Sequence, residues 1–210
     1  MTAPSHSAPS PPGETASAPV AGRAPKETPL GFAREGLLHL ALGYDHALFL
    51  AALVATARGA RRLALAITSF SLAHMASLAL VTVGAVRLPQ APVEACIALS
   101  IVMMARVAAG EGSSWLARSP ALAVFPLGLL HGLGFGSALD GAGLPRERLA
   151  ESLLAFHVGI EAGQLALALG LSAALHALGP AREPWVRRGA MLVGALGCAI
   201  TIERALALGS

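Results

Sequence analysis

The sequence predicts an all-α membrane protein, a polytopic bundle of about six transmembrane helices. Only 13% of its 210 residues are charged, whereas a soluble domain averages about 25%. Apolar residues make up 55% of the chain, the mean hydropathy is +0.65, and the apolar residues form long blocks. Glycine and alanine are abundant, which suits close packing of helices in lipid. Together these features are typical of a multi-pass membrane protein.

The first 30 residues differ from the rest of the chain, because they are rich in Pro, Ser and Ala. Such a segment cannot bury enough apolar surface to fold. We therefore expect a disordered tail over residues 1–30 and a transmembrane helical domain over residues 31–210.

The apolar blocks set the expected spans. A helix rises 1.5 Å per residue, so about 20 residues cross the hydrocarbon core of roughly 30 Å. The third block is short, while the first and fifth are long enough to tilt. The expected spans are residues 32–57, 63–84, 91–109, 119–139, 150–178 and 186–208.

The first expected span carries three titratable side chains in "GLLHLALGYDH". His39 and His46 are seven residues apart. Seven residues turn a helix by about 700°, so the two rings are expected on one face, two turns apart. Asp45 points about 100° away and is expected to face a neighbouring histidine or the edge of the same cavity.

The second and third expected spans add further polar groups. Ser71 and His74 stand at i and i+3 and are expected to share a narrow stripe of one helix. Glu94 follows Pro92 in the first turn of the third span. This glutamate either complements the helix dipole or supports the polar site.

The fourth and fifth expected spans complete the set. His131 is followed by Gly132, and glycine lets another backbone or an ion approach. His157, Glu161 and Gln164 stand at i, i+4 and i+7, on one stripe of a helix. A charged side chain at mid-depth costs about 2.5–3.5 kcal/mol, so a glutamate there must be paired, protonated or bound to a cation.

Polar side chains in a membrane bundle face its interior, so these groups are expected to converge on one cavity. Histidine is the commonest metal ligand and suits nickel, cobalt and zinc, while carboxylates add oxygen donors. The candidate metal ligands are His39, Asp45, His46, His74, His131, His157 and Glu161, and the supporting residues are Glu94, Gln164, Gly132 and Ser71.

Arginines between the spans predict the orientation. They are more frequent in the first, third and fifth connections, which are therefore expected in the cytoplasm, with both termini outside. The net charge of +3 is attributed to this role, so no nucleic-acid partner is expected. The acidic residues Asp140, Glu147 and Glu151 fall on the expected outer side and would attract cations.

An internal repeat is also indicated. "GLLHLALGYD" at 36–45 begins like "GLLHGLGFGS" at 128–137, in expected spans that run in opposite directions. The second and fifth spans each carry a histidine, and the third and sixth each carry a cysteine. This pattern predicts a possible 3+3 inverted repeat, a plan common among secondary transporters.

The order of "GLLHLALGYDHALFL", "TSFSLAH", "PVEACIALSIV", "GLLHGLGFG" and "FHVGIEAGQ" over about residues 31–170 resembles the HupE/UreJ family. The resemblance implies a multi-pass protein of the bacterial inner membrane, tied to nickel supply for hydrogenase or urease. It also implies that the family's functional motifs fall on His39, Asp45 and His46, on His131 and Gly132, and on Glu161.

The expected function is a permease for a divalent transition metal, nickel or cobalt, with zinc as a further possible ion. The expected partners are the lipid bilayer, the metal ion and a hydrogenase or urease maturation system. Two alternatives use the same residues. One is an intramembrane zinc-dependent hydrolase, in which histidines hold a zinc ion that activates water. The other is an accessory membrane factor for hydrogenase or urease that does not transport. An enzyme is the less favoured of these readings.

Overall fold

The computed structural model describes residues 28–57, 59–111, 118–134 and 148–207. Helix is the one type of regular structure in these ranges, so the all-α prediction is confirmed. The elements are α1 (Pro29–Leu42), α2 (Tyr44–Thr56), α3 (Ala60–Thr82), α4 (Gln90–Ala108), α6 (Pro120–Leu133), α8 (Leu149–Ala177), the short 3-10 helix η2 (Gly179–Ala181) and α9 (Arg182–Leu206).

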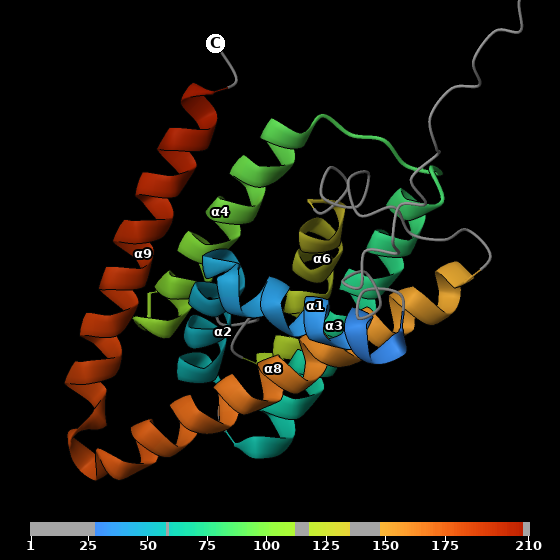
Figure 1. The fold of residues 1–210 in the computed structure, drawn as a ribbon. Helices are drawn as coiled ribbons and strands as arrows, with labels where there is room; N and C mark the ends of the chain where they lie inside the picture. The colour runs from blue at the N-terminus through green and yellow to red at the C-terminus, as the bar shows by residue number, and fades with distance from the viewer. Residues whose placement is uncertain (1–27, 58, 112–117, 135–147, 208–210) are drawn as a thin grey trace, which may run out of the picture.

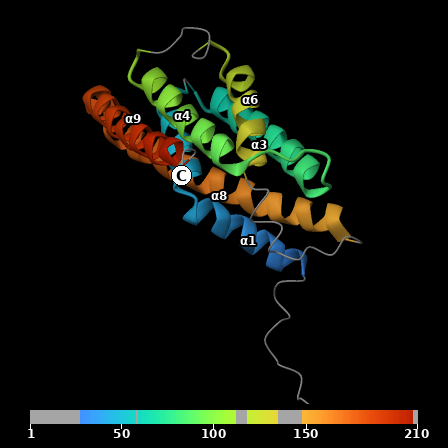
Figure 2. The same cartoon turned by 90° about the horizontal axis from the view of Figure 1, so that it is seen from above.

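The helices pack in three main pairs around α2. Helix α3 packs on α6, α4 on α9, and α1 on α8, and these pairs lie side by side in both views of the fold (Figures 1 and 2). Helix α2 sits between them and contacts α4 and α8. Its side chains Phe49 and Leu53 are almost fully buried and join the central apolar cluster. The polar site is therefore built around α2.

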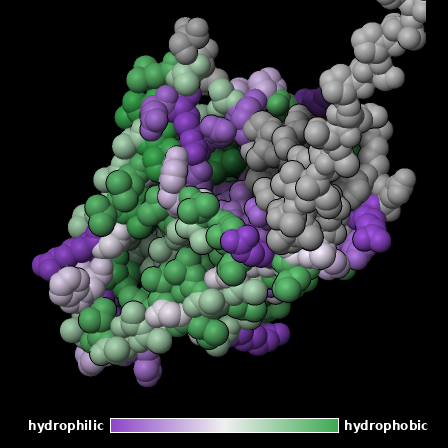
Figure 3. Space-filling view, in the orientation of Figure 1, coloured by the Kyte–Doolittle hydropathy of each residue, from purple (hydrophilic) through white to green (hydrophobic). Residues whose placement is uncertain are grey.

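Four helices are long and apolar enough to cross a membrane: α3, α4, α8 and α9 with η2. The number rises to five if α1 and α2 form one broken span. Helix α6 has 14 residues, or about 21 Å, which is less than a full crossing. Apolar side chains cover most of the described surface over α8 and α9 (Figure 3), as contact with lipid requires. The chain is a multi-pass helical membrane protein, for which six spans is an approximate count.

The expectation of one continuous first span is wrong. Helix α1 ends at Leu42, α2 begins at Tyr44, and the two are bent by 73°. Gly43 stands at the break with φ −81° and ψ +86°, outside the helical region. A Cβ on Gly43 would lie 2.7 Å from the carbonyl oxygen of His39 and 3.1 Å from Nδ1 of His46. The break is therefore built closely around a residue that has no side chain.

Glycines let α1 and α8 pack backbone against backbone. A Cβ on Gly36 would overlap the carbonyl oxygen of Phe156, and one on Gly159 would overlap the carbonyl oxygen of Ala33. Such contacts leave no room for any side chain, which explains the small residues at these positions.

The helical domain begins at Pro29, two residues before the expected boundary. Thr28 caps α1, because its Oγ1 accepts a hydrogen bond from the Gly31 backbone N–H at 3.1 Å. Residues 1–27, which make up most of the expected tail, lie outside the described residues.

Candidate metal centre

Five histidines form a cluster that has His46 of α2 near its centre. The other four come from α1, α3, α6 and α8. The ring centroid of His46 lies 4.9 Å from that of His39, 5.6 Å from that of His74 and 5.3 Å from that of His131. His157 lies 5.8 Å from His74 on the far side of the group. The structure thus brings together all five histidines that the sequence selected, each from its own helix.

Three of these side chains, His39, His46 and His74, lie close enough together that they could hold a metal ion. One nitrogen from each can be chosen so that all three lie within 4.8 Å of one another. Histidine nitrogens bind zinc at about 2.0–2.1 Å, so two ligands of one ion lie at most about 4.2 Å apart. Small rotations of the rings would therefore be enough to enclose a transition-metal ion.

Several of the imidazole nitrogens are buried without a hydrogen-bond partner among the described residues. They are Nε2 of His46, both nitrogens of His74, and Nε2 of His131. Most buried polar atoms in proteins are hydrogen-bonded, and an unsatisfied one costs about 1–3 kcal/mol. Each neutral imidazole has one nitrogen with a free lone pair, so the cluster offers several electron-pair donors that fit a cation.

The tautomer of His131 is determined by the backbone. Its Nδ1 lies 2.8 Å from the carbonyl oxygen of Leu127. A carbonyl oxygen only accepts, so Nδ1 must carry the proton and donate it. The lone pair is then on Nε2, the nitrogen without a partner in the described chain. Metal-binding histidines are commonly oriented in this way by a carbonyl group.

Two aromatic rings pack against one side of the cluster. Phe49 and Phe70 are stacked with their centroids 4.9 Å apart, and each lies 5.1 Å from the ring of His131. Both phenylalanines are 3% exposed or less. They place apolar surface against the cluster, and an apolar environment has a low dielectric constant, which strengthens electrostatic interactions with an ion.

Glu161 lies one helical turn from His157 and faces α3. Its carboxylate is hydrogen-bonded to the hydroxyl of Ser71, which is also 2.8 Å from the amide oxygen of Gln164. The hydroxyl has one proton and can donate to only one acceptor at a time. This polar group links α3 to α8 beside the histidines, so Glu161 has a protein partner within the bundle.

Asp45 pairs with an arginine instead of a histidine. Its Oδ2 lies 2.7 Å from Nη2 of Arg204 in α9, and Arg204 also approaches Glu94, whose carboxylate lies 3.8 Å from Nε. This contact was not predicted from the sequence, where the arginines were interpreted as signals of membrane orientation. The available signal was a basic residue inside an apolar run, in "CAITIERALAL".

A model of the family described as HupE / UreJ protein matches residues 16–205 of the chain. The chain belongs to the HupE/UreJ family. No curated protein and no solved structure matches it.

In this HupE/UreJ protein Gly132 allows α6 to approach α3. A Cβ on Gly132 would overlap Ser77 Oγ and the carbonyl oxygen of His74, and a Cβ on Gly128 would overlap the backbone of Phe70. Gly132, which was expected to support the site, is therefore a position of close helix packing. This packing brings His131 near the other rings.

Of the three acidic residues expected at the outer side of the HupE/UreJ protein, the structure describes one. Asp140 and Glu147 lie outside the described residues. Glu151 is exposed in the first turn of α8.

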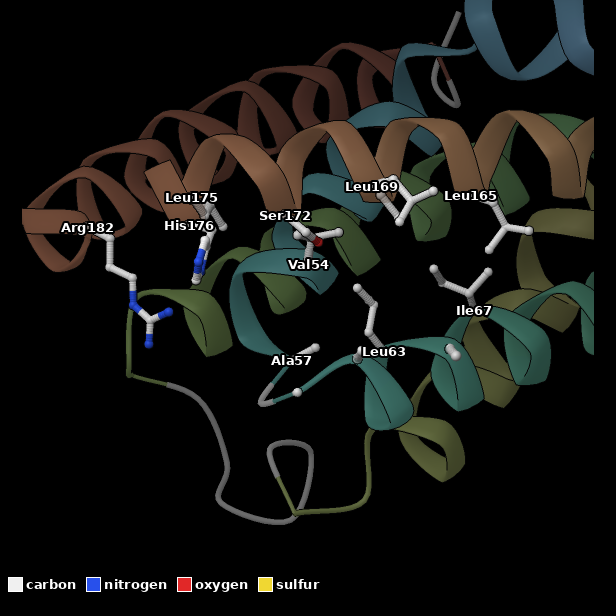
Figure 4. A pocket seen from close by; sticks show the side chains of 14 residues that line it. Val54, Ala57, Leu63, Ile67, Leu165, Leu169, Ser172, Leu175, His176 and Arg182 are labelled. Atoms are coloured by element: carbon white, nitrogen blue, oxygen red, sulfur yellow. The ribbon is translucent and has the colours of Figure 1, made fainter. Parts of the chain in front are cut away.

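A groove of about 450 Å³ lies between α8 and the start of α3. Its walls are mainly apolar, with His176 and Arg182 at one end (Figure 4). Ile67 lines both this groove and a small cavity beside His46. The groove was not predicted from the sequence, and its lining includes His176 but none of the five clustered histidines.

Proposed function

We propose that this HupE/UreJ protein is a permease-like membrane protein for a divalent transition metal, nickel or cobalt. The observation that carries the proposal is the placement of His39, His46 and His74, with ligand nitrogens within 4.8 Å of one another in the interior of the bundle. Neutral imidazoles suit these ions. The family resemblance favours nickel.

The remaining candidate ligands extend away from these three. His131 lies next to His46, and His157 lies next to His74. Glu161 follows His157 by one turn of α8 and offers oxygen. We infer that the ion exchanges among several ligand sets along this row, because a transported ion must bind in more than one place and leave each of them readily.

The alternatives make different demands on the same residues. A zinc-dependent hydrolase needs a metal that is retained and a coordination position for water. An accessory factor for hydrogenase or urease maturation needs binding without net flux. Measuring whether the protein retains the metal and whether cells take it up therefore distinguishes a permease from a hydrolase and from an accessory factor.

The test is uptake of labelled Ni²⁺ and Co²⁺ into cells that express the full chain, together with metal analysis of the purified protein. His46→Ala and His74→Ala are expected to reduce uptake at least about tenfold, since each removes a central ligand. His176→Ala is the matched control, because His176 is exposed at the end of α8.

Uptake by His46→Ala and His74→Ala at the level of the parent would refute this role of the cluster. Stoichiometric zinc that survives purification would favour the hydrolase. Binding of nickel without uptake would favour the accessory factor.

A further inference from the structure

Arg204 reaches from the last helix to the break between α1 and α2. Its Nη2 donates to Asp45 Oδ2 at 2.7 Å and to the hydroxyl of Tyr44 at 3.3 Å, while Nη1 donates to the carbonyl oxygen of Glu94 at 2.9 Å. The guanidinium also lies over the ring of Tyr44, 5.9 Å from its centroid. The side chain is only 15% exposed. One residue thus ties α9 to the first turn of α2 and to Glu94, just after the first turn of α4.

Asp45 directly precedes the central ligand His46, and Arg204 occupies only one of its two carboxylate oxygens. Oδ2 is in the ion pair, while Oδ1 is buried without a hydrogen-bond partner among the described residues. The carboxylate stands in the first turn of α2, where the positive end of the helix dipole stabilises negative charge. The carboxylate of the residue directly before His46 is therefore bound to a guanidinium, while its second oxygen is left for another partner.

We propose that Arg204 is a positioning residue that retains the Asp45 carboxylate in an ion pair and so keeps metal binding at His39, His46 and His74 weak enough for release. This inference rests on the proposed function. A carboxylate added to three imidazoles would supply a negative charge and a fourth ligand. The positive charge of Arg204 also opposes a nearby cation. Both effects weaken binding, and transport requires an ion that can leave.

The chemistry of arginine explains why this residue type is suited to the position. The planar guanidinium presents five donors, and here it serves Asp45, the Glu94 carbonyl and Tyr44 at once. A lysine has a single ammonium group that cannot reach three acceptors in this arrangement. It would retain the charge but would hold Asp45 less firmly.

The test measures competition binding of Ni²⁺ and Co²⁺ to the purified full-length protein, with uptake into cells as a second readout. Arg204→Gln is expected to bind Ni²⁺ about tenfold more tightly, an effect of the size that groups next to metal ligands have, and to take it up more slowly. Arg204→Lys is expected to bind with intermediate affinity. The double variant Arg204→Gln/Asp45→Asn is expected to return close to the affinity of the parent.

Arg187→Gln is the matched control, since Arg187 is an exposed arginine of the same helix. A merely structural role for Arg204 would weaken binding and uptake together, which is the opposite of the expected split. Affinity that is unchanged or weaker in Arg204→Gln would overturn the inference, as would tight binding that persists in the double variant. If Arg204→Gln does not fold, the absence of any tightening in Arg204→Lys would have the same consequence.

Metal binding by the parent protein separates the test of the proposed function from the test of the role of Arg204. A parent protein that binds neither ion would refute the proposed function, and the role of Arg204 with it. A parent that binds and transports metal, with no tightening in the Arg204 variants, would refute the role of Arg204 alone.

Discussion

At the scale of single residues, Gly43 decides how His39 and His46 meet. In a continuous helix, seven residues would separate the two positions by about 10.5 Å along the axis. The ring centroids lie 4.9 Å apart, because the chain bends by 73° between them. The two histidines lie close together, but not because they share the face of one helix, which was the reason predicted from the sequence.

Gly43→Ala is expected to abolish or strongly weaken nickel binding. Its Cβ would press on the carbonyl oxygen of His39 and on the ring of His46. Alanine also favours helix over glycine by about 1 kcal/mol, which promotes a straight helix that separates the rings. Competition binding of Ni²⁺ to the purified variant measures the effect.

The control for this substitution is Gly189→Ala in α9, where a Cβ meets nothing within 4 Å. It is expected to bind as the parent does. Unchanged affinity in Gly43→Ala would show that the bend does not depend on glycine.

At the scale of helices, pairs that are distant in sequence place the histidines. Gly36 in α1 packs on the backbone of Phe156 in α8, and Gly128 in α6 packs on that of Phe70 in α3. These two glycines open the matching "GLLH" segments. The pairing of α1 with α8 and of α6 with α3 is the arrangement that a 3+3 inverted repeat requires. The repeat itself stays a prediction, now supported by equivalent contacts.

Gly159→Ala is expected to destabilise the protein by about 1–3 kcal/mol, the usual cost of overpacking. The new methyl group would overlap the carbonyl oxygen of Ala33 and push α1 away from α8. Thermal unfolding of the purified protein in detergent measures the loss.

Gly170→Ala offers a control in the same helix, because a Cβ there meets nothing within 4 Å. It is expected to be neutral or stabilising through helix propensity. Equal thermal stability of the two alanine variants would contradict the close packing of α1 against α8.

At the scale of the whole molecule, the end of α9 and the starts of α2 and α4 lie together at one end of the bundle. Arg204, near the end of α9, contacts Asp45 at the start of α2 and Glu94 near the start of α4. The C-terminal end of α9 lies at the upper edge in Figure 1. The arginine distribution predicts that this end faces outward, so the ion would reach the histidine cluster from the side of Asp45 and Glu94.

Cysteine labelling tests this orientation. In a chain with Cys96→Ser and Cys198→Ser, Arg87→Cys is expected to react with a membrane-impermeant thiol reagent in intact cells. Arg61→Cys is expected to react only in inverted vesicles, because it begins α3 on the predicted cytoplasmic side. The reverse pattern of labelling would invert the predicted topology.

The sequence by itself determined the class of the protein, the approximate place of α3, α4, α8 and α9, and the five histidines of the cluster. These features depend on local quantities. The thickness of the hydrocarbon core sets the length of an apolar run, and the cost of burying polar groups directs them inward.

Only the tertiary structure decided the break at Gly43, the close grouping of His39, His46 and His74, and the pairing of Asp45 with Arg204. The ion pair joins residues 159 positions apart in the chain. Such contacts depend on how helices pack against one another and on where glycine lets their backbones touch. Neither hydropathy nor the spacing of residues within one helix specifies that packing.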